Sequence, residues 1–345
     1  MRLVLTLLVR DEADVVDAQI AYHLRAGVDF VVATDNRSED ATTGILERYE
    51  REGRLRLIRE PGDDLRQSEW VTRMARLAAT DHGADWVLNA DADEFWRPRG
   101  GTFAELLAEV PERYGVLRGA WRNFVPRPEG EPFFAERMTA RLCTPSFHPH
   151  PLSTHFKSLH RAVPEVRVGR GNHEAFAEGL VPLRGWYPIE ILHFPVRSLE
   201  HCVRKYVTQF VALERNAEKG IPGHMEEAYE AYRQGRLAEF YAPLVVVDDA
   251  LARGLEEGTY AIDTRLRDTL RSLGYGRAGE GDRADAGHPA DDDGAQFAAE
   301  YSALAEADPY LTLAARIVEL ESRVATLERT PGVHARGFLR RSARA

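Results

Sequence analysis

The chain has 345 residues, of which 44% are hydrophobic and 29% charged, and a formal net charge of −10. This balance is typical of a globular protein with a full core, so it argues against wholesale disorder and against an integral membrane protein. An acidic chain lacks the basic face that general nucleic-acid binding requires. Only Cys143 and Cys202 occur, which excludes a disulfide framework and a cysteine zinc site and fits a reduced, cytoplasmic compartment.

The first hundred residues alternate between apolar runs and helical patterns. The run Leu3–Val9 could be mistaken for a signal peptide, but no small-residue cleavage site follows it, so we interpret it as a buried strand. Alternation with short links predicts a parallel α/β sheet. The expected strands are Leu3–Val9, Phe30–Thr34, Leu55–Ile58 and Trp86–Leu88, and the expected helices are Val15–Ala26, Thr42–Glu52 and Ser68–Thr80.

The remainder of the chain is less regular. Short β-like pieces are expected at Gly115–Trp121, Phe156–Leu159, Val166–Val168 and Ile189–His193, and a mainly helical pattern follows from 198 to 273. We expect four units: a catalytic domain over 1–245, a helical extension over 246–276, a flexible acidic linker over 277–296, and a C-terminal amphipathic or short coiled-coil helix with a basic tail over 297–345.

The C-terminal unit suggests two further properties. Its heptad-like spacing is compatible with a homo-oligomer, and its basic tail with peripheral contact to anionic lipid at the inner face of the membrane. The alternatives are a helix docked on the body and a solvated chain end. No uninterrupted apolar run approaches the ~18 residues that a spanning helix needs.

Polar, carboxylate-rich tips follow each predicted strand of the first hundred residues. Open parallel sheets bind ligands at the carboxyl ends of their strands, so these tips indicate a site, although loop tips are usually polar anyway. Asp91-Ala92-Asp93, directly after an apolar strand, is the strongest feature. Two converging carboxylates suit Mg²⁺ or Mn²⁺ bridging to a diphosphate, and the alternative is an acidic turn. P-loop, dinucleotide, nucleophile-elbow and HExxH motifs are missing from the sequence.

Four motifs in order resemble those of family 2-like glycosyltransferases with the GT-A fold, over about residues 1–100. They are the run Leu8–Asp14, the pair Tyr22-His23, the turn Asp35–Asp40 and the segment Asp91–Phe95. A looser likeness continues through Lys157, 171–173 and 192–198. The resemblance implies an α/β, Rossmann-like, mostly parallel sheet flanked by helices, with a C-terminal helical extension. It also implies metal-dependent, inverting transfer of a sugar from a nucleotide-sugar donor to an acceptor hydroxyl, in polysaccharide or glycoconjugate synthesis.

The resemblance also implies roles for single residues. Asp91 and Asp93 match the metal-binding pair, and His193 is the expected third ligand, with His173 as the alternative. An imidazole ligand favours Mn²⁺ over Mg²⁺, while an ordinary hydrogen-bonded histidine is the other interpretation. The residues expected to bind the nucleotide or donor are Arg10, Asp11, Glu12, Asp35, Arg73, Asp91 and Lys157. Arg37 stands where the family turn often has a glycine, which leaves the shape of this turn open.

The acceptor side is less defined. A carboxylate must take the proton of the acceptor hydroxyl, and we expect Glu174 to do so, with Glu94 and Glu190 as alternatives. The donor would be linked to UDP, GDP or dTDP, and the acceptor would be a saccharide or glycoconjugate. Two other functions stay open: a metal-dependent phosphohydrolase or nucleotidyltransferase that uses the same carboxylates, and a non-catalytic GT-A-like binding or scaffold module.

Overall fold

A computed structural model of the chain describes residues 1–62, 65–130, 133–143, 156–215 and 223–276. The predicted linker over 277–296 and the predicted C-terminal helix and tail over 297–345 therefore lie outside the described residues. Within the described ranges, no helix is both long enough and apolar enough to cross a membrane.

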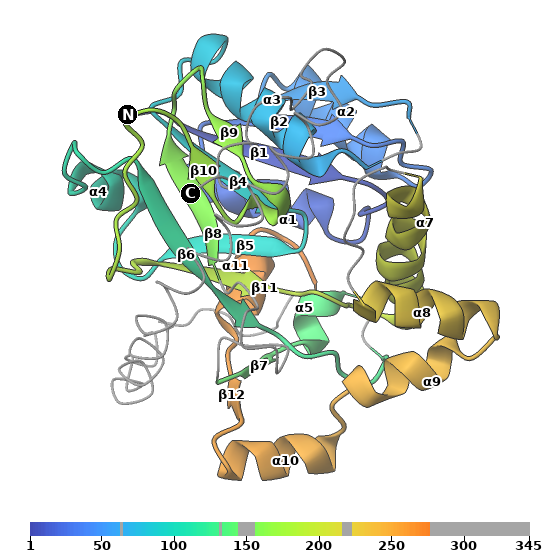
Figure 1. The fold of residues 1–345 in the computed structure, drawn as a ribbon. Helices are drawn as coiled ribbons and strands as arrows, with labels where there is room; N and C mark the ends of the chain where they lie inside the picture. Colours follow the sequence, from blue (N-terminus) through green and yellow to red (C-terminus); the bar gives the residue numbers. More distant parts are fainter. Residues whose placement is uncertain (63–64, 131–132, 144–155, 216–222, 277–345) are drawn as a thin grey trace, which may run out of the picture.

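The centre of the described structure is an eight-stranded sheet (Figure 1) in the order β3-β2-β1-β4-β8-β6-β11-β5. Strands β3, β2, β1 and β4 are parallel, as are β6 and β11, whereas β8 and β5 run antiparallel to their neighbours. The strands are β1 (Leu3–Val9), β2 (Phe30–Asp35), β3 (Leu55–Arg59), β4 (Trp86–Asp91), β5 (Glu94–Pro98), β6 (Val116–Asn123), β8 (Phe156–Arg161) and β11 (Ile189–His193).

Helices cover both faces of this sheet. The three that link the first four strands are α1 (Val16–Arg25), α2 (Thr42–Arg51) and α3 (Gln67–Thr80). Leu5 of β1 packs in one core cluster with Ile20 of α1, whereas Val4 packs in another with Met74 of α3. Successive side chains of a strand point to opposite faces, so α1 and α3 cover opposite faces. The predicted α/β class, with a mostly parallel sheet flanked by helices, is confirmed.

Shorter elements follow in the middle of the chain. They are α4 (Phe103–Ala108), α5 (Phe134–Arg137), β7 (Ala140–Leu142), β9 (Arg167–Val168), the 3-10 turn η1 (Arg170–Asn172) and β10 (Ala175–Phe176). Next come α6 (Leu199–Cys202), the π-helical turn η2 (Val203–Thr208), α7 (Gln209–Glu214), α8 (Gly223–Arg233), α9 (Leu237–Tyr241) and the 3-10 turn η3 (Ala242–Leu244).

The segment expected as a helical extension over 246–276 contains a strand as well as helices. Its elements are α10 (Asp248–Glu256), β12 (Tyr260–Ile262) and α11 (Arg265–Ser272). Strand β12 pairs antiparallel with β7, so this segment completes a small two-stranded sheet beside the central one. An ion pair between Arg265 of α11 and the buried Glu190 of β11 joins it to the central sheet.

The link between β4 and β5 determines where the site forms. Only Ala92 and Asp93 separate these strands in sequence, yet β8, β6 and β11 lie between them in the sheet order. The sheet must therefore curl, so that its last strand returns to the carboxyl end of β4 (Figure 1). The acid triplet occupies this junction, where the ends of β4 and β11 meet the start of β5.

Candidate functional site

Asp91 ends β4 and is held from two sides. The antiparallel pairing of β8 with β4 and β6 brings Lys157, near the start of β8, to this end of the sheet. Its ammonium donates to Oδ2 of Asp91, while Nδ2 of Asn172 donates to Oδ1 at 3.1 Å. Lys157 is 2% exposed, and the charge of Asp91 offsets the loss of hydration that burying an ammonium entails.

Asn172 adopts an unusual backbone conformation to make this contact. Its φ is +60°, and that of Gly171 before it is +70°. Asparagine tolerates the left-handed region better than most residues, yet such strain persists mainly at functional sites. Ser158 Oγ donates to the carbonyl of Asn172 at 3.1 Å, and Gln67 Oε1 accepts from the amide of Gly171 at the same distance. These bonds fix the turn that presents the amide to Asp91.

Asp93 lies in the two-residue link and is 3% exposed. The strand register places His193 opposite Glu94, next to Asp93, and the Phe194 amide donates to the Asp93 carbonyl at 2.9 Å. Nε2 of His193 is 3.7 Å from Oδ2 of Asp93, and the ammonium of Lys205, from η2, donates to the same oxygen. Burial would raise the pKa of Asp93, but Lys205 and His193 hold that pKa well below its usual range.

His193 is oriented by Asn123, at the end of β6. Nδ1 of His193 lies 2.7 Å from the Asn123 amide oxygen, which can only accept, so Nδ1 carries the proton. Burial lowers the pKa of His193 despite the raising effect of Asp93, which favours the neutral ring. Nε2 is the ring nitrogen on the side of Asp93, 3.7 Å from its Oδ2. The Trp121 ring stacks on His193 with centroids 4.5 Å apart and fixes the plane of the imidazole.

Glu94 is the most deeply buried carboxyl of the junction, with 0% exposure. It accepts from the Asp91 amide at 3.1 Å and from Trp121 Nε1 at 3.0 Å, and it faces Lys157 Nζ at 3.1 Å. Burial raises its pKa to about 7, although Lys157 acts in the opposite direction. Through Trp121 and Lys157, Glu94 links the acid triplet to β6 and β8.

A second group of charges connects the first strand tip to α6. The Arg197 guanidinium, 1% exposed, pairs with Glu12 and Asp14, and His201 Nε2 lies 3.6 Å from Glu12 Oε2. Burial would raise the pKa of Glu12, but Arg197 and His201 lower it. Arg197 also acts electrostatically on Asp93, so the predicted tip residue Glu12 belongs to the same charge system as the acid triplet.

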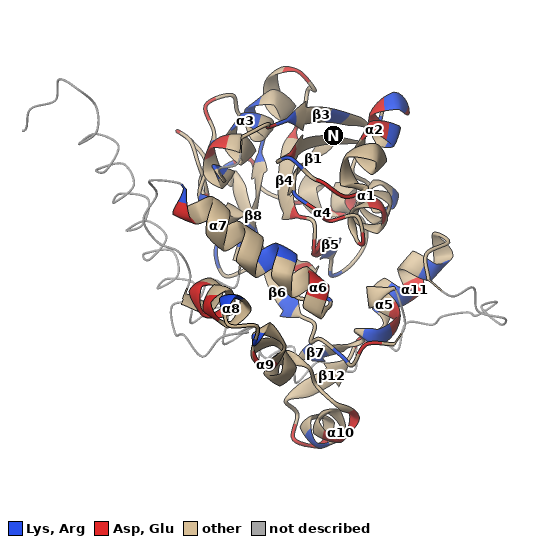
Figure 2. Cartoon of the chain, turned by 90° about the vertical axis from the view of Figure 1, so that its right-hand side faces the viewer, with Lys and Arg blue, Asp and Glu red and all other residues tan. Residues whose placement is uncertain are grey.

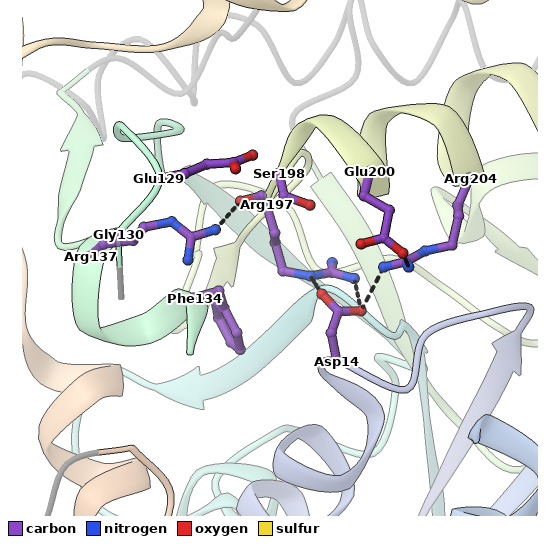
Figure 3. Close-up of a pocket in the computed structure, with 9 residues that line it drawn as sticks. All are labelled: Asp14, Glu129, Gly130, Phe134, Arg137, Arg197, Ser198, Glu200 and Arg204. Carbon is purple, nitrogen blue, oxygen red and sulfur yellow. Dashed lines mark hydrogen bonds and ion pairs between the residues drawn. The ribbon is translucent and has the colours of Figure 1, made fainter. Parts of the chain in front are cut away.

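A cavity of about 320 Å³ is lined in part by Arg197 (Figure 3). Its lining carries three acids and three arginines, namely Asp14, Glu129, Glu200, Arg137, Arg197 and Arg204, together with Gly130, Phe134 and Ser198. None of the predicted site residues lines it. This cavity is therefore not the predicted nucleotide pocket, and its balanced lining does not select a ligand of one charge.

The turn after β2 is held by its own carboxylate. Asp35 accepts from the Ser38 amide at 3.0 Å and from the Thr43 hydroxyl at 2.5 Å. Arg37 has a φ of +59°, in the left-handed region that glycine adopts more readily than other residues. Asp11, at φ +55°, joins the first two tips by accepting from the Glu39 amide at 2.7 Å. Nucleotide binding by Asp11 and Asp35 stays a prediction.

The other two cations predicted for the donor form ion pairs with neighbouring acids. Arg73, on α3, pairs with Glu60 after β3, and Arg10 Nε lies 3.9 Å from Asp11 Oδ2. Arg73 thus forms its ion pair just after β3, whereas Lys157 is the predicted cation that contacts Asp91 directly. Their roles toward a diphosphate stay predictions.

The three carboxylates considered as the base differ in their surroundings. Glu174 pairs with Arg118, and burial raises its pKa against the effect of that arginine. Glu190 is enclosed by arginines, and although burial alone would raise its pKa, Arg265 and the others lower it to about 2. The side chain of Glu174 is 12% exposed, against 6% for Glu190 and 0% for Glu94. Among these three, Glu174 is thus the most accessible to an acceptor.

The predicted metal donors are brought together in part. Within the described residues, no group of three or more His, Cys, Asp or Glu side chains is placed to hold a metal ion. Asp93 and His193 nevertheless present an oxygen and an imidazole nitrogen to each other. Mg²⁺ is usually bound by one or two carboxylates plus substrate phosphates. This pair therefore fits a cation whose remaining ligands come from a diphosphate. Asp91 instead contacts Lys157 and Asn172, and His173 Nδ1 lies 2.7 Å from the carbonyl of Phe156.

Sequence reasoning missed Lys205 and Asn123 as parts of this site. Lys205 is separated from Asp93 by more than a hundred residues, and no local motif marks it. Asn123 could be inferred only from the register of β6 and β11, which pairs it with His193. The Trp121 indole also belongs to the site, because it contacts His193 and Glu94.

Comparisons with known proteins identify the enzyme class. A family model described as glycosyltransferase family 92 matches residues 8–124, which include β2–β6, the end of β1 and the acid triplet. No curated protein matches the sequence.

Two solved structures show the level of structural similarity. One is TarS of S. aureus with UDP-GlcNAc, with a TM-score of 0.38, 14% identity, and 70% and 71% of the two chains covered. Another is glucosyl-3-phosphoglycerate synthase of Mycobacterium tuberculosis with Mn²⁺, UDP and phosphoglyceric acid, with a TM-score of 0.25, 19% identity, and 35% and 43% coverage. Both likenesses are too low to carry an argument about ligands. The family match confirms the predicted enzyme class, a glycosyltransferase, while the family 2-like subgroup stays a prediction.

Proposed function

We propose that the chain transfers a sugar from a UDP-, GDP- or dTDP-linked donor to a hydroxyl of a saccharide or glycoconjugate, with inversion and with a divalent cation. The observation that supports this most strongly is the junction at the carboxyl end of β4. There Asp93 and His193 Nε2 face each other at 3.7 Å, with Lys157 and Lys205 beside them. Carboxylate, imidazole and two ammonium groups suit a metal-bound diphosphate.

In this proposal Asp93 and His193 would hold the cation, and the imidazole favours Mn²⁺ over Mg²⁺. The bound cation would supply positive charge to the diphosphate as it leaves. Nδ1 of His193 contacts the Asn123 oxygen, which leaves Nε2 as the ring nitrogen on the side of the cation, and Trp121 stacks on the ring. Lys157 would contribute a second charge, fixed in the protein and needing no reorganisation during the reaction.

Glu174 is the proposed base, because it is the most accessible of the three carboxylates considered. Its ion pair with Arg118 favours the ionised form, which can accept the proton of an acceptor hydroxyl. Glu94 is enclosed by donors, and Glu190 has too low a pKa to be an effective base. Replacing Glu174 with Gln should lower kcat far more than it weakens donor binding, because the base acts only in the chemical step.

The experiment that tests this function is a thermal shift measurement with UDP-, GDP- and dTDP-sugars, with and without Mn²⁺. We expect one nucleotide series to raise the Tm, and to do so more strongly with the metal. A phosphohydrolase would instead release phosphate or nucleotide from these donors without glycosylating an acceptor. If none of the nucleotide sugars stabilises the protein in the presence of Mn²⁺, the proposal fails.

We also propose peripheral attachment to the inner membrane face and homo-oligomerisation through residues 297–345. Both rest on the sequence alone, because this segment lies outside the described residues. Removal of residues 277–345 should leave donor binding intact while changing vesicle binding or the molar mass in solution. Loss of donor binding in the truncated chain would show that the unit boundary at 276 is wrong.

A further inference from the structure

Lys205 places its ammonium on the atom of Asp93 that a metal ion would need. It donates to Oδ2, the same oxygen that lies 3.7 Å from Nε2 of His193. Its side chain is 18% exposed, whereas that of Asp93 is 5% exposed. Lys205 is thus the more exposed side chain of a nearly buried pair.

The backbone around Lys205 is helical but not regular. Residues Val203–Thr208 form a π-helical turn between α6 and α7, a rare geometry that is frequent at functional sites. The basic segment between α6 and α7 in Figure 2 lies on this turn. Tyr206, the next residue, is buried with Cys202, Ala228 and Leu237, which anchors the turn. The lysine stem is flexible, so its ammonium can leave Asp93 while the backbone stays in place.

Two cations cannot share this position. A divalent ion bound by Asp93 and His193 would lie next to an ammonium at the same oxygen, and like charges at such short range in a buried site repel strongly. Metal binding to the free protein therefore has to break the pair between Lys205 and Asp93. A nucleoside diphosphate provides a new anionic partner for the displaced ammonium.

We propose that Lys205 is a resident cation of Asp93 that a divalent metal ion displaces, and that the displaced ammonium then binds the diphosphate of the donor. The inference rests on the proposed function. It makes metal and nucleotide binding cooperative, because each favours the displaced position of Lys205. The coupling acts equally in both directions, and allosteric couplings are typically about 5- to 150-fold.

The test is Mn²⁺ binding by the full chain, measured by electron paramagnetic resonance without nucleotide and then with saturating UDP, GDP or dTDP. Lys205→Met should bind Mn²⁺ at least about fivefold more tightly than the wild type without nucleotide, because no resident cation competes. The increase in affinity caused by the nucleotide should shrink in this variant. Arg233→Met, which removes an exposed cation on α8, is the matched control and should behave like the wild type.

Further measurements separate the possible failures. Lys205→Gln serves as a second variant if Lys205→Met fails to fold, and circular dichroism checks both. Equal or weaker Mn²⁺ binding by the folded lysine variants without nucleotide would overturn the inference while leaving the proposed function in place. If the wild type and both variants fail to bind Mn²⁺ with any of the three nucleotides, the metal-dependent function and the inference both fall.

Discussion

Nδ1 of His193 lies 2.7 Å from the side-chain oxygen of Asn123, and this contact fixes which ring nitrogen faces Asp93. The two residues are paired by the register of β6 and β11, so the sheet itself sets the tautomer. Partners that orient a metal-binding histidine are typically worth 10- to 100-fold in metal affinity.

Asn123→Ala should weaken Mn²⁺ binding in the presence of nucleotide by about 10- to 100-fold, because the imidazole can then take either tautomer. Isothermal titration calorimetry measures this effect. Asn123→Asp keeps an acceptor at the same position and should retain most of the affinity. If the alanine and aspartate variants bind Mn²⁺ with the same affinity, the proposed orienting role of Asn123 is wrong.

Two substitutions of Asn172 separate the effect of its backbone strain from the effect of its hydrogen bond to Asp91. Asn172→Gly removes the cost of a positive φ, whereas Asn172→Ala keeps it. The free energy of unfolding of the alanine variant should therefore be lower than that of the glycine variant by about 1 kcal/mol. Both lose the amide that donates to Asp91 and should raise KM for the donor to a similar extent. A glycine variant with unchanged KM would show that this hydrogen bond does not position Asp91.

Glu94 should make the stability of the protein depend on pH. Burial raises its folded-state pKa from 4.5 to about 7, so between these values the folded state holds more protons than the unfolded state. Stability contributed by the protonated form is present below pH 4.5 and is lost as the pH rises toward 7. Urea unfolding of Glu94→Gln between pH 5 and 8 should therefore show a smaller decline than the wild type. A parallel pH dependence of the two proteins would contradict this assignment.

We predict that replacing Glu190 affects the stability of the protein rather than its catalysis. Glu190 pairs with the buried Arg122 and with the partly exposed Arg99 and Arg265 and is itself 4% exposed, so Glu190→Gln removes the counter-charge that these three guanidinium groups share. Breaking a buried pair in this way costs about 3–5 kcal/mol. We expect a large fall in Tm, while donor affinity at low temperature is retained. Reduced transfer activity with an unchanged Tm would assign the carboxylate to chemistry instead.

The sequence allowed much of the sheet to be predicted and less of the site. Hydrophobic runs such as Leu3–Val9 are local, so the first four strands could be placed to within a few residues. The curl that brings β5 back to β4 depends on pairing between distant strands, and the position of Lys205 depends on how η2 packs. Neither leaves a local pattern. The ion pairs of Asp91 and Glu174 likewise involve Lys157 and Arg118, which only the fold brings close.

The central claim is that Asp93 at the β4–β5 junction binds the metal-bound nucleotide sugar. The most direct measurement is calorimetric titration of the wild type and Asp93→Ala with each nucleotide sugar in Mn²⁺. We predict metal-dependent binding of one donor by the wild type and its loss in the variant, with the circular dichroism spectrum of the two proteins unchanged. Equal, metal-dependent affinity of both proteins for the donor would contradict the account.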